Sequence, residues 1–137
     1  MPDREPRDDA GADGAWYSYA IIRIVPRVER EEFLNVGVVL FARTARFLEA
    51  RVELDEARLR AFAPDADVAR IRSHLDTFCA IARGDASAGE VAQLDQSQRF
   101  HWLTAPRSTV IQTSPVHIGC SDDPARELGD LMRTLVL

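Results

Sequence analysis

Residues 16–27 read WYSYAIIRIVPR, and the expected fold can be worked outward from this stretch. Aromatic and β-branched side chains dominate it, which favours an extended strand. Both faces of that strand are apolar, with Tyr17, Tyr19 and Ile21 on one and Ala20, Ile22 and Ile24 on the other. A strand that is apolar on both faces is typical of the centre of a sheet. We therefore predict a sheet arranged around this strand, which Pro26 ends because proline has no backbone N–H to donate.

Two further strands are predicted downstream. Residues 36–42, VGVVLFA, form a second buried run, in which Gly37 indicates a bulge or a close approach of another backbone. Residues 46–53 alternate, with Leu48, Ala50 and Val52 on one face and Glu49, Arg51 and Glu53 on the other. This alternation is typical of an antiparallel strand with one face in solvent, so we expect the charged face to be solvated.

Helix signals occupy the middle of the chain. Asp55 is a predicted N-cap for a short helix over residues 56–62. Asp65 or Asp67 is the predicted N-cap of a longer helix that runs to residue 83. Apolar residues repeat along this second helix with the spacing of one buried face: Val68, Ile71, Leu75, Phe78, Cys79 and Ala82.

A final helix is predicted after Asp123 and Pro124, an N-cap residue followed by proline at the first helical position. We therefore predict an α+β fold: a small single domain over residues 15–137, with a mainly antiparallel sheet of four or five strands covered by two main helices. Residues 1–14 contain no large apolar side chain apart from the initiator Met1, and we expect them to be a disordered acidic tail.

Charge and composition limit the classes of function. The first fourteen residues hold five acids and two arginines, so they account for −3 of the net charge of −5. The remainder is close to balanced, and nucleic-acid binding is not expected because it depends on clustered cations. No apolar run approaches the roughly 18 residues of a membrane span, and no signal-peptide pattern is present. We expect a cytoplasmic protein that does not insert in a membrane, with Cys79 and Cys120 as free thiols.

The most polar candidate for a site is residues 106–117, PRSTVIQTSPVH. In an extended chain the side chains alternate, which places Ser108, Gln112 and Ser114 on one side as a row of hydrogen-bonding groups. Arg107 at the start of the stretch can bind a carboxylate or phosphate through two hydrogen bonds, and His117 adds an imidazole just past the second proline. We predict a small polar pocket at one end of the sheet. The alternative is a solvated sheet face with caps and turns.

Two upstream residues are further candidates. Arg23 is the single charged residue on the tyrosine face of the first strand. One interpretation is structural: the side chain extends to solvent or pairs with an acid. The other is functional: its guanidinium points into a pocket. Asn35, directly before the second strand, either braces the turn or contributes to the site. The arrangement His117-x-x-Cys120 with Asp122 or Asp123 is too sparse for a metal site, and the chain contains no known catalytic motif; we expect neither a metal nor a cofactor.

Three blocks of the sequence together resemble a family of small bacterial proteins, domain of unknown function 3037. They are YSYAIIRIVPRVEREEFLNVGVVLF from Tyr17, RFLEARVELD from Arg46, and FHWLTAPRSTVIQTSPVHIG from Phe100. The positions that match the family signature are Asn35, Gly37, Arg107, Ser108, Gln112, Ser114, Pro115 and His117. The resemblance implies no catalytic residues. It implies a gene neighbourhood that includes kinases of the HipA type, and hence such a kinase as a candidate partner.

The sequence leaves two functions open. The first is a non-enzymatic accessory module that binds a partner protein, for which a HipA-like kinase is the candidate. The second is an enzyme or sensor that binds a small anionic ligand, bearing phosphate or carboxylate, in a polar pocket. The residues assigned to that pocket are Arg107, Ser108, Gln112, Ser114, His117, Asn35 and Arg23.

Overall fold

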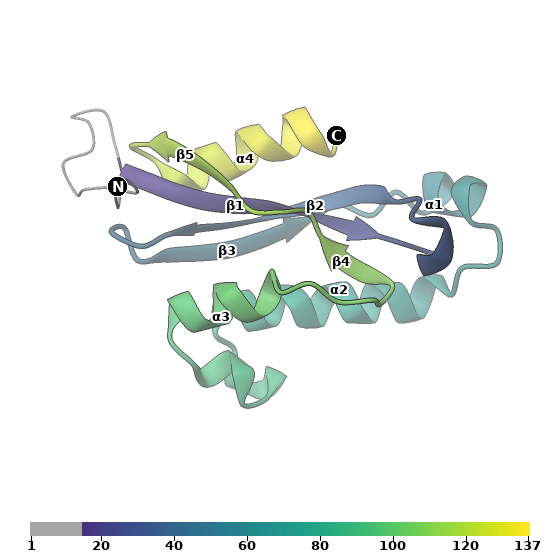
Figure 1. The fold of residues 1–137 in the computed structure, drawn as a ribbon, viewed down its shortest axis with the longest axis horizontal. Helices are drawn as coiled ribbons and strands as arrows, with labels where there is room; N and C mark the ends of the chain where they lie inside the picture. The colour runs from purple at the N-terminus through teal and green to yellow at the C-terminus, as the bar shows by residue number, and fades with distance from the viewer. Residues whose placement is uncertain (1–14) are drawn as a thin grey trace.

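The computed structural model describes residues 15–137, and it is built around the predicted central strand (Figure 1). Strand β1 (Ala15–Ile24) pairs along one edge with β2 (Leu34–Ala42), which in turn pairs with β3 (Phe47–Val52). Along its other edge, β1 pairs with β4 (Ile111–Thr113) near its C-terminal end and with β5 (His117–Ser121) near its N-terminal end. All pairings are antiparallel and the sheet has five strands, so the predicted α+β fold with an antiparallel sheet of four or five strands is confirmed.

Helices lie on both sides of the sheet. Helices α1 (Glu56–Phe62), α2 (Val68–Arg83) and α3 (Gln96–Leu103) lie on one face, and α4 (Pro124–Leu135) lies on the other (Figure 1). The larger core packs Ala20, Ile22 and Ile24 of β1 against α1, α2 and α3. The smaller core packs Tyr17 of β1 and residues of β2 against Leu128 and Met132 of α4. The two faces of β1 are therefore both buried, as its sequence predicts.

The helix starts follow the predicted caps. The side chains of Asp55, Asp67 and Asp123 each accept a hydrogen bond from a backbone N–H in the first turn of α1, α2 and α4 respectively. Gly84 ends α2 in the left-handed conformation, with φ of 76°, which glycine adopts without steric cost. Short polar side chains satisfy the free N–H groups at a helix start. The predicted starts of these three helices are therefore confirmed.

Helix α3 was not predicted. Its start carries a capping box, in which the Asp95 side chain accepts from the Gln98 backbone N–H and the Gln98 side chain accepts from the Asp95 N–H. The buried guanidinium of Arg99 donates to the carbonyl oxygens of Leu94 and Ala82, and so ties α3 to the end of α2. The Asp-x-x-Gln spacing was the signal in the sequence that could have located this helix.

Gly37 allows a close approach of two backbones. A Cβ atom at this position would lie 2.3 Å from the Arg51 carbonyl oxygen on β3. The pairing of β1 with β2 also shifts register next to it, from Ile22 opposite Gly37 to Arg23 opposite Asn35. The predicted bulge or close approach is therefore present.

The stretch 107–114 does not form the long extended strand assumed in the sequence analysis. Strand β4 covers only residues 111–113, and residues 105–110 form an irregular segment that returns from α3 to the sheet edge. The alternation argument therefore fails for Arg107 and Ser108. No helix among residues 15–137 has the length and apolar character that a membrane crossing requires.

Candidate functional site

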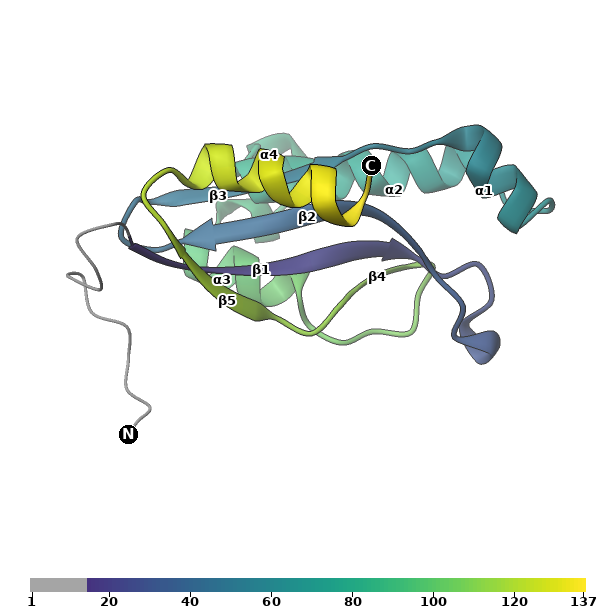
Figure 2. The ribbon, with the colours of Figure 1, turned by 90° about the horizontal axis from the view of Figure 1, so that it is seen from above.

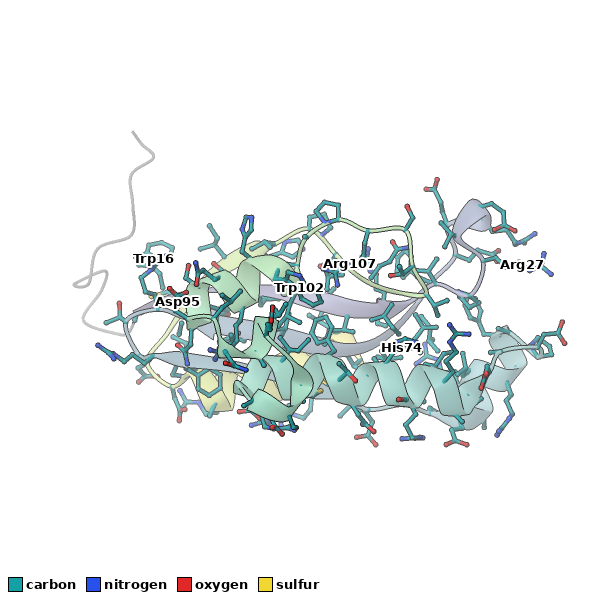
Figure 3. The ribbon with its side chains drawn as sticks, turned by 90° about the horizontal axis from the view of Figure 1, so that it is seen from below. Trp16, Arg27, His74, Asp95, Trp102 and Arg107 are labelled. Atoms are coloured by element: carbon teal, nitrogen blue, oxygen red, sulfur yellow. The ribbon has the colours of Figure 1, made fainter. Side chains whose placement is uncertain are left out.

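A groove of about 1060 Å³ opens on the face of the molecule that carries α2 (Figure 3). One wall is α2, and the opposite wall is the irregular segment that leads into β4. The connections between β1 and β2 and between α1 and α2 close one end. The residues that line it are Pro26, Arg27, Arg30, Glu32, residues 62–67, Arg70, Ile71, His74, Thr77, Phe78, Ile81, Trp102, Arg107 and residues 109–111.

Trp102 and Arg107 contact each other at the groove rim. The Arg107 guanidinium carbon lies 4.5 Å from the centre of the Trp102 ring. The same guanidinium donates a hydrogen bond of 2.5 Å from Nη2 to the Trp102 carbonyl oxygen. A cation over an aromatic face is attracted by the ring quadrupole, so each side chain holds the other in place. Trp102 nevertheless remains 40% exposed.

Other exposed apolar side chains line the same groove. Phe62 at the end of α1 is 40% exposed, and Val110 in the opposite wall is 38% exposed. Phe78 and Ile81 of α2 are buried and contribute to its floor. Apolar surface that is grouped in a concave site, rather than scattered singly, is typical of a binding surface.

Four arginines and three acids line the groove, so its charges nearly balance, but they are unevenly placed. Arg30 pairs with Glu32 at 2.9 Å. By contrast, Arg27, Arg70 and Arg107 form no ion pair with any residue in 15–137. Two further acids lie at the α1–α2 end, and one of them, Asp67, is occupied as the N-cap of α2. The Arg107 side of the groove therefore favours a group with negative charge.

The other residues predicted to share a pocket with Arg107 are not in this groove. The Gln112 side chain donates to the carbonyl oxygen of Thr109 at 2.8 Å, and Gln112 lies opposite Arg23 on the central strand. His117 is exposed on β5 and stacks on Tyr19, with 5.2 Å between the ring centres. Gln112 and His117 are therefore not among the residues that line the groove with Arg107.

Ser114 and Ser108, the two predicted site serines, differ in environment. Ser114 is 2% exposed; its hydroxyl accepts from the Ile21 N–H at 2.8 Å and donates to the Pro115 carbonyl oxygen at 2.9 Å. It attaches the segment between β4 and β5 to β1, at the point where Pro115 cannot donate a backbone hydrogen bond. Ser108 is exposed in the irregular segment, and its side chain makes no hydrogen bond within residues 15–137.

Three predicted site residues form a row across the sheet, on the face that carries α4. Arg23 lies opposite Asn35 of β2 on one side and opposite Gln112 of β4 on the other. The Arg23 guanidinium carbon lies 3.9 Å from the centre of the Phe33 ring. Asn35 donates from its side-chain amide to the Leu135 carbonyl oxygen at the end of α4, at 3.3 Å. Asn35, at one end of this row, therefore contacts the C-terminal end of α4 (Figure 2).

The sequence analysis did not identify the most prominent groove residues. Trp102, Arg27, Arg70 and Phe62 come from four different segments, which only the fold brings together. Trp102 was detectable in principle, because the capping box places it on a helix whose buried positions are Phe100 and Leu103. His117 and Cys120 point to opposite faces of β5, since they pair with Tyr19 and Trp16 of the central strand. Within residues 15–137, no three His, Cys, Asp or Glu side chains are grouped as metal ligands.

The fold defines the class of protein: an α+β domain with a mixed apolar and cationic groove on one face of its sheet. Residues 19–136 match the model of a family described as protein of unknown function (DUF3037). The chain belongs to this family, as the three sequence blocks indicated. No curated protein and no solved structure matches it.

Proposed function

We propose that this protein is an accessory interaction module that holds an acidic, partly apolar segment of a partner protein in the α2 groove. The observation that carries the proposal is the fixed pair of Trp102 and Arg107 at the groove rim, with Trp102 40% exposed. Tryptophan and arginine are the side chains that most often dominate binding energy at protein interfaces. A rigid exposed tryptophan also loses little conformational entropy when a partner covers it.

The size of the groove supports a polypeptide rather than a small metabolite. Its volume of about 1060 Å³ is at the upper limit of the roughly 300–1,000 Å³ that is usual for small-molecule pockets. Apolar side chains of the partner would cover Phe62, Trp102 and Val110. Carboxylates of the partner would pair with Arg107, Arg70 and Arg27, which have no ion-pair partner of their own in residues 15–137.

The family resemblance supplies a first partner to test, a kinase of the HipA type encoded near the gene in the same host. The tagged protein, expressed at its native level, is expected to co-purify with this kinase. The Trp102→Ala variant is expected to lose the kinase. The matched control is Trp16→Ala, because Trp16 is equally exposed at 40% and lies outside the groove.

A selection with displayed random peptides tests the groove without assuming a partner. The wild-type protein should enrich peptides that combine acidic residues with bulky apolar ones, and Trp102→Ala should not retain them. Enrichment of basic peptides, or equal retention by both proteins, would contradict the proposal.

A further inference from the structure

A second site lies on the opposite face of the sheet, and it does not depend on the groove. Its centre is Arg23, an arginine on the central strand of the sheet and half-buried. Long charged side chains in such positions are normally paired with an acid. No acid in residues 15–137 forms an ion pair with Arg23.

The surroundings of Arg23 fix the guanidinium without neutralising it. Phe33, which is itself 45% exposed, lies against it at 3.9 Å. The amide nitrogens of Asn35 and Gln112 are already used by carbonyl oxygens, so neither amide supplies a negative charge. The buried Nε of Arg23 and the buried Oδ1 of Asn35 have no hydrogen-bond partner, and the two Nη groups donate to no residue in the described chain. Burial lowers the pKa of Arg23, which reflects the cost of this unpaired charge.

We propose that Arg23 binds the carboxylate of a ligand that also has an apolar body, with the carboxylate on the Nη edge and the body against Phe33. A single cation suits a singly charged carboxylate better than a doubly charged phosphate, which usually needs several donors. Ile21 on the same face is buried, so the exposed ring of Phe33 supplies the apolar surface beside the cation. Figure 2 shows that α4 ends before the part of the sheet that carries β4, so this face is not covered by the helix.

Sodium benzoate is the appropriate probe, because it combines one carboxylate with an aromatic body. Acetate and inorganic phosphate at equal ionic strength are the comparisons. Benzoate is expected to bind with the highest affinity of the three. In NMR spectra it should shift the signals of the Arg23 Nε–H and the Phe33 ring, while the Trp102 indole N–H stays unchanged.

Two variants separate this site from the groove. Arg23→Met keeps the length of the side chain and should weaken benzoate binding by about tenfold or more, the loss expected for a charge-assisted pair. Arg107→Met should leave benzoate binding unchanged. Without ligand, Arg23→Met should melt at the same temperature as the wild type or higher, because an unpaired cation is removed from a partly buried position.

Three results would overturn the proposal. The first is benzoate binding to Arg23→Met with unchanged affinity. The second is a shift at Trp102 in place of the shifts at Arg23 and Phe33. The third is a lower melting temperature for Arg23→Met together with no benzoate binding to the wild type, which would make Arg23 a structural residue. Failure of this site leaves the groove proposal unaffected, since the two share no residue.

Discussion

Tyr17 and Glu127 are joined by a hydrogen bond of 2.7 Å from the tyrosine hydroxyl to a carboxylate oxygen, although they lie 110 residues apart in the sequence. The bond connects the central strand β1 to the first turn of α4. Tyr17 is 7% exposed and belongs to the smaller core, so the bond forms at the edge of an apolar layer. It therefore fixes the position of α4 on the sheet.

Replacing Tyr17 with phenylalanine is expected to destabilise the protein by roughly 1–2 kcal/mol, because the ring is kept and only the hydrogen bond to a charged group is lost. Urea denaturation followed by circular dichroism measures this free energy of unfolding. A Tyr19→Phe variant is the control, since the Tyr19 hydroxyl makes no hydrogen bond within residues 15–137. Equal stability of Tyr17→Phe and the wild type would show that the bond does not hold α4.

The same tyrosine predicts a response to alkaline pH. Burial, and then the hydrogen bond to Glu127, raise the pKa of Tyr17 above its usual value of 10.0. A raised pKa in the folded state stabilises the protein below pH 10, and this contribution is lost as the pH rises further. The free energy of unfolding should therefore fall more steeply above pH 10 in the wild type than in Tyr17→Phe. Parallel curves for the two proteins would contradict this.

Gly119 is required for the Tyr17 ring to lie across β5. A Cβ atom at this position would lie 2.4 Å from the Tyr17 hydroxyl oxygen. Gly119→Ala should therefore displace the ring and cost about 1–3 kcal/mol, the usual penalty for overpacking. Gly129→Ala in α4 is the matched control, because its nearest neighbour would be at 3.4 Å; alanine there should stabilise the helix by about 0.5–1 kcal/mol. Thermal unfolding of both variants should show melting temperatures that move in opposite directions.

The two serines of the 106–117 stretch provide another matched pair. Ser114→Ala leaves the buried Ile21 N–H without the acceptor it has now, which should cost about 1–3 kcal/mol. Ser108→Ala should change stability by less than about 0.5 kcal/mol, as is usual for exposed positions. Urea denaturation distinguishes the two. Similar small effects would mean that the Ser114 hydroxyl does not hold this segment to β1.

The two cysteines should differ in reactivity. Burial raises the pKa of Cys79 from its usual 9.0 to about 11, whereas Cys120 is exposed. The thiolate is the reactive form, so an alkylating reagent at pH 8 should modify the exposed Cys120 quickly and the half-buried Cys79 much more slowly. Mass spectrometry of the labelled wild type and of Cys120→Ser measures this. Rapid labelling of folded Cys120→Ser would contradict the burial of Cys79.

The sequence was sufficient to predict the parts of the fold that depend on local pattern. Runs of aromatic and β-branched residues identified β1 and β2, period-two alternation identified β3, and the aspartate caps identified α1, α2 and α4. The interruption between β4 and β5 was not predictable in this way, because it depends on a hydrogen bond between Ser114 and Ile21, 93 residues apart. The alternation argument failed for Arg107 and Ser108 because residues 105–110 are irregular and β4 begins only at Ile111.

The candidate site was less predictable than the fold. Asn35, Arg23 and Gln112 were singled out separately, and strand pairing places them in one row. Arg107 was also singled out, but its contact is Trp102, on a helix that was not predicted. The groove combines α2, the α1–α2 connection and the segment before β4. Sequence spacing carries no information on how such distant segments meet.

The central claim is that the groove binds a partner segment through Trp102. Isothermal titration calorimetry of a selected acidic peptide with the wild type, Trp102→Ala and Trp16→Ala tests it most directly. We expect Trp102→Ala to lose about 2 kcal/mol of binding free energy, which is about thirtyfold in Kd, and Trp16→Ala to bind like the wild type. Equal Kd values for the wild type and Trp102→Ala, with both proteins folded, would contradict the claim.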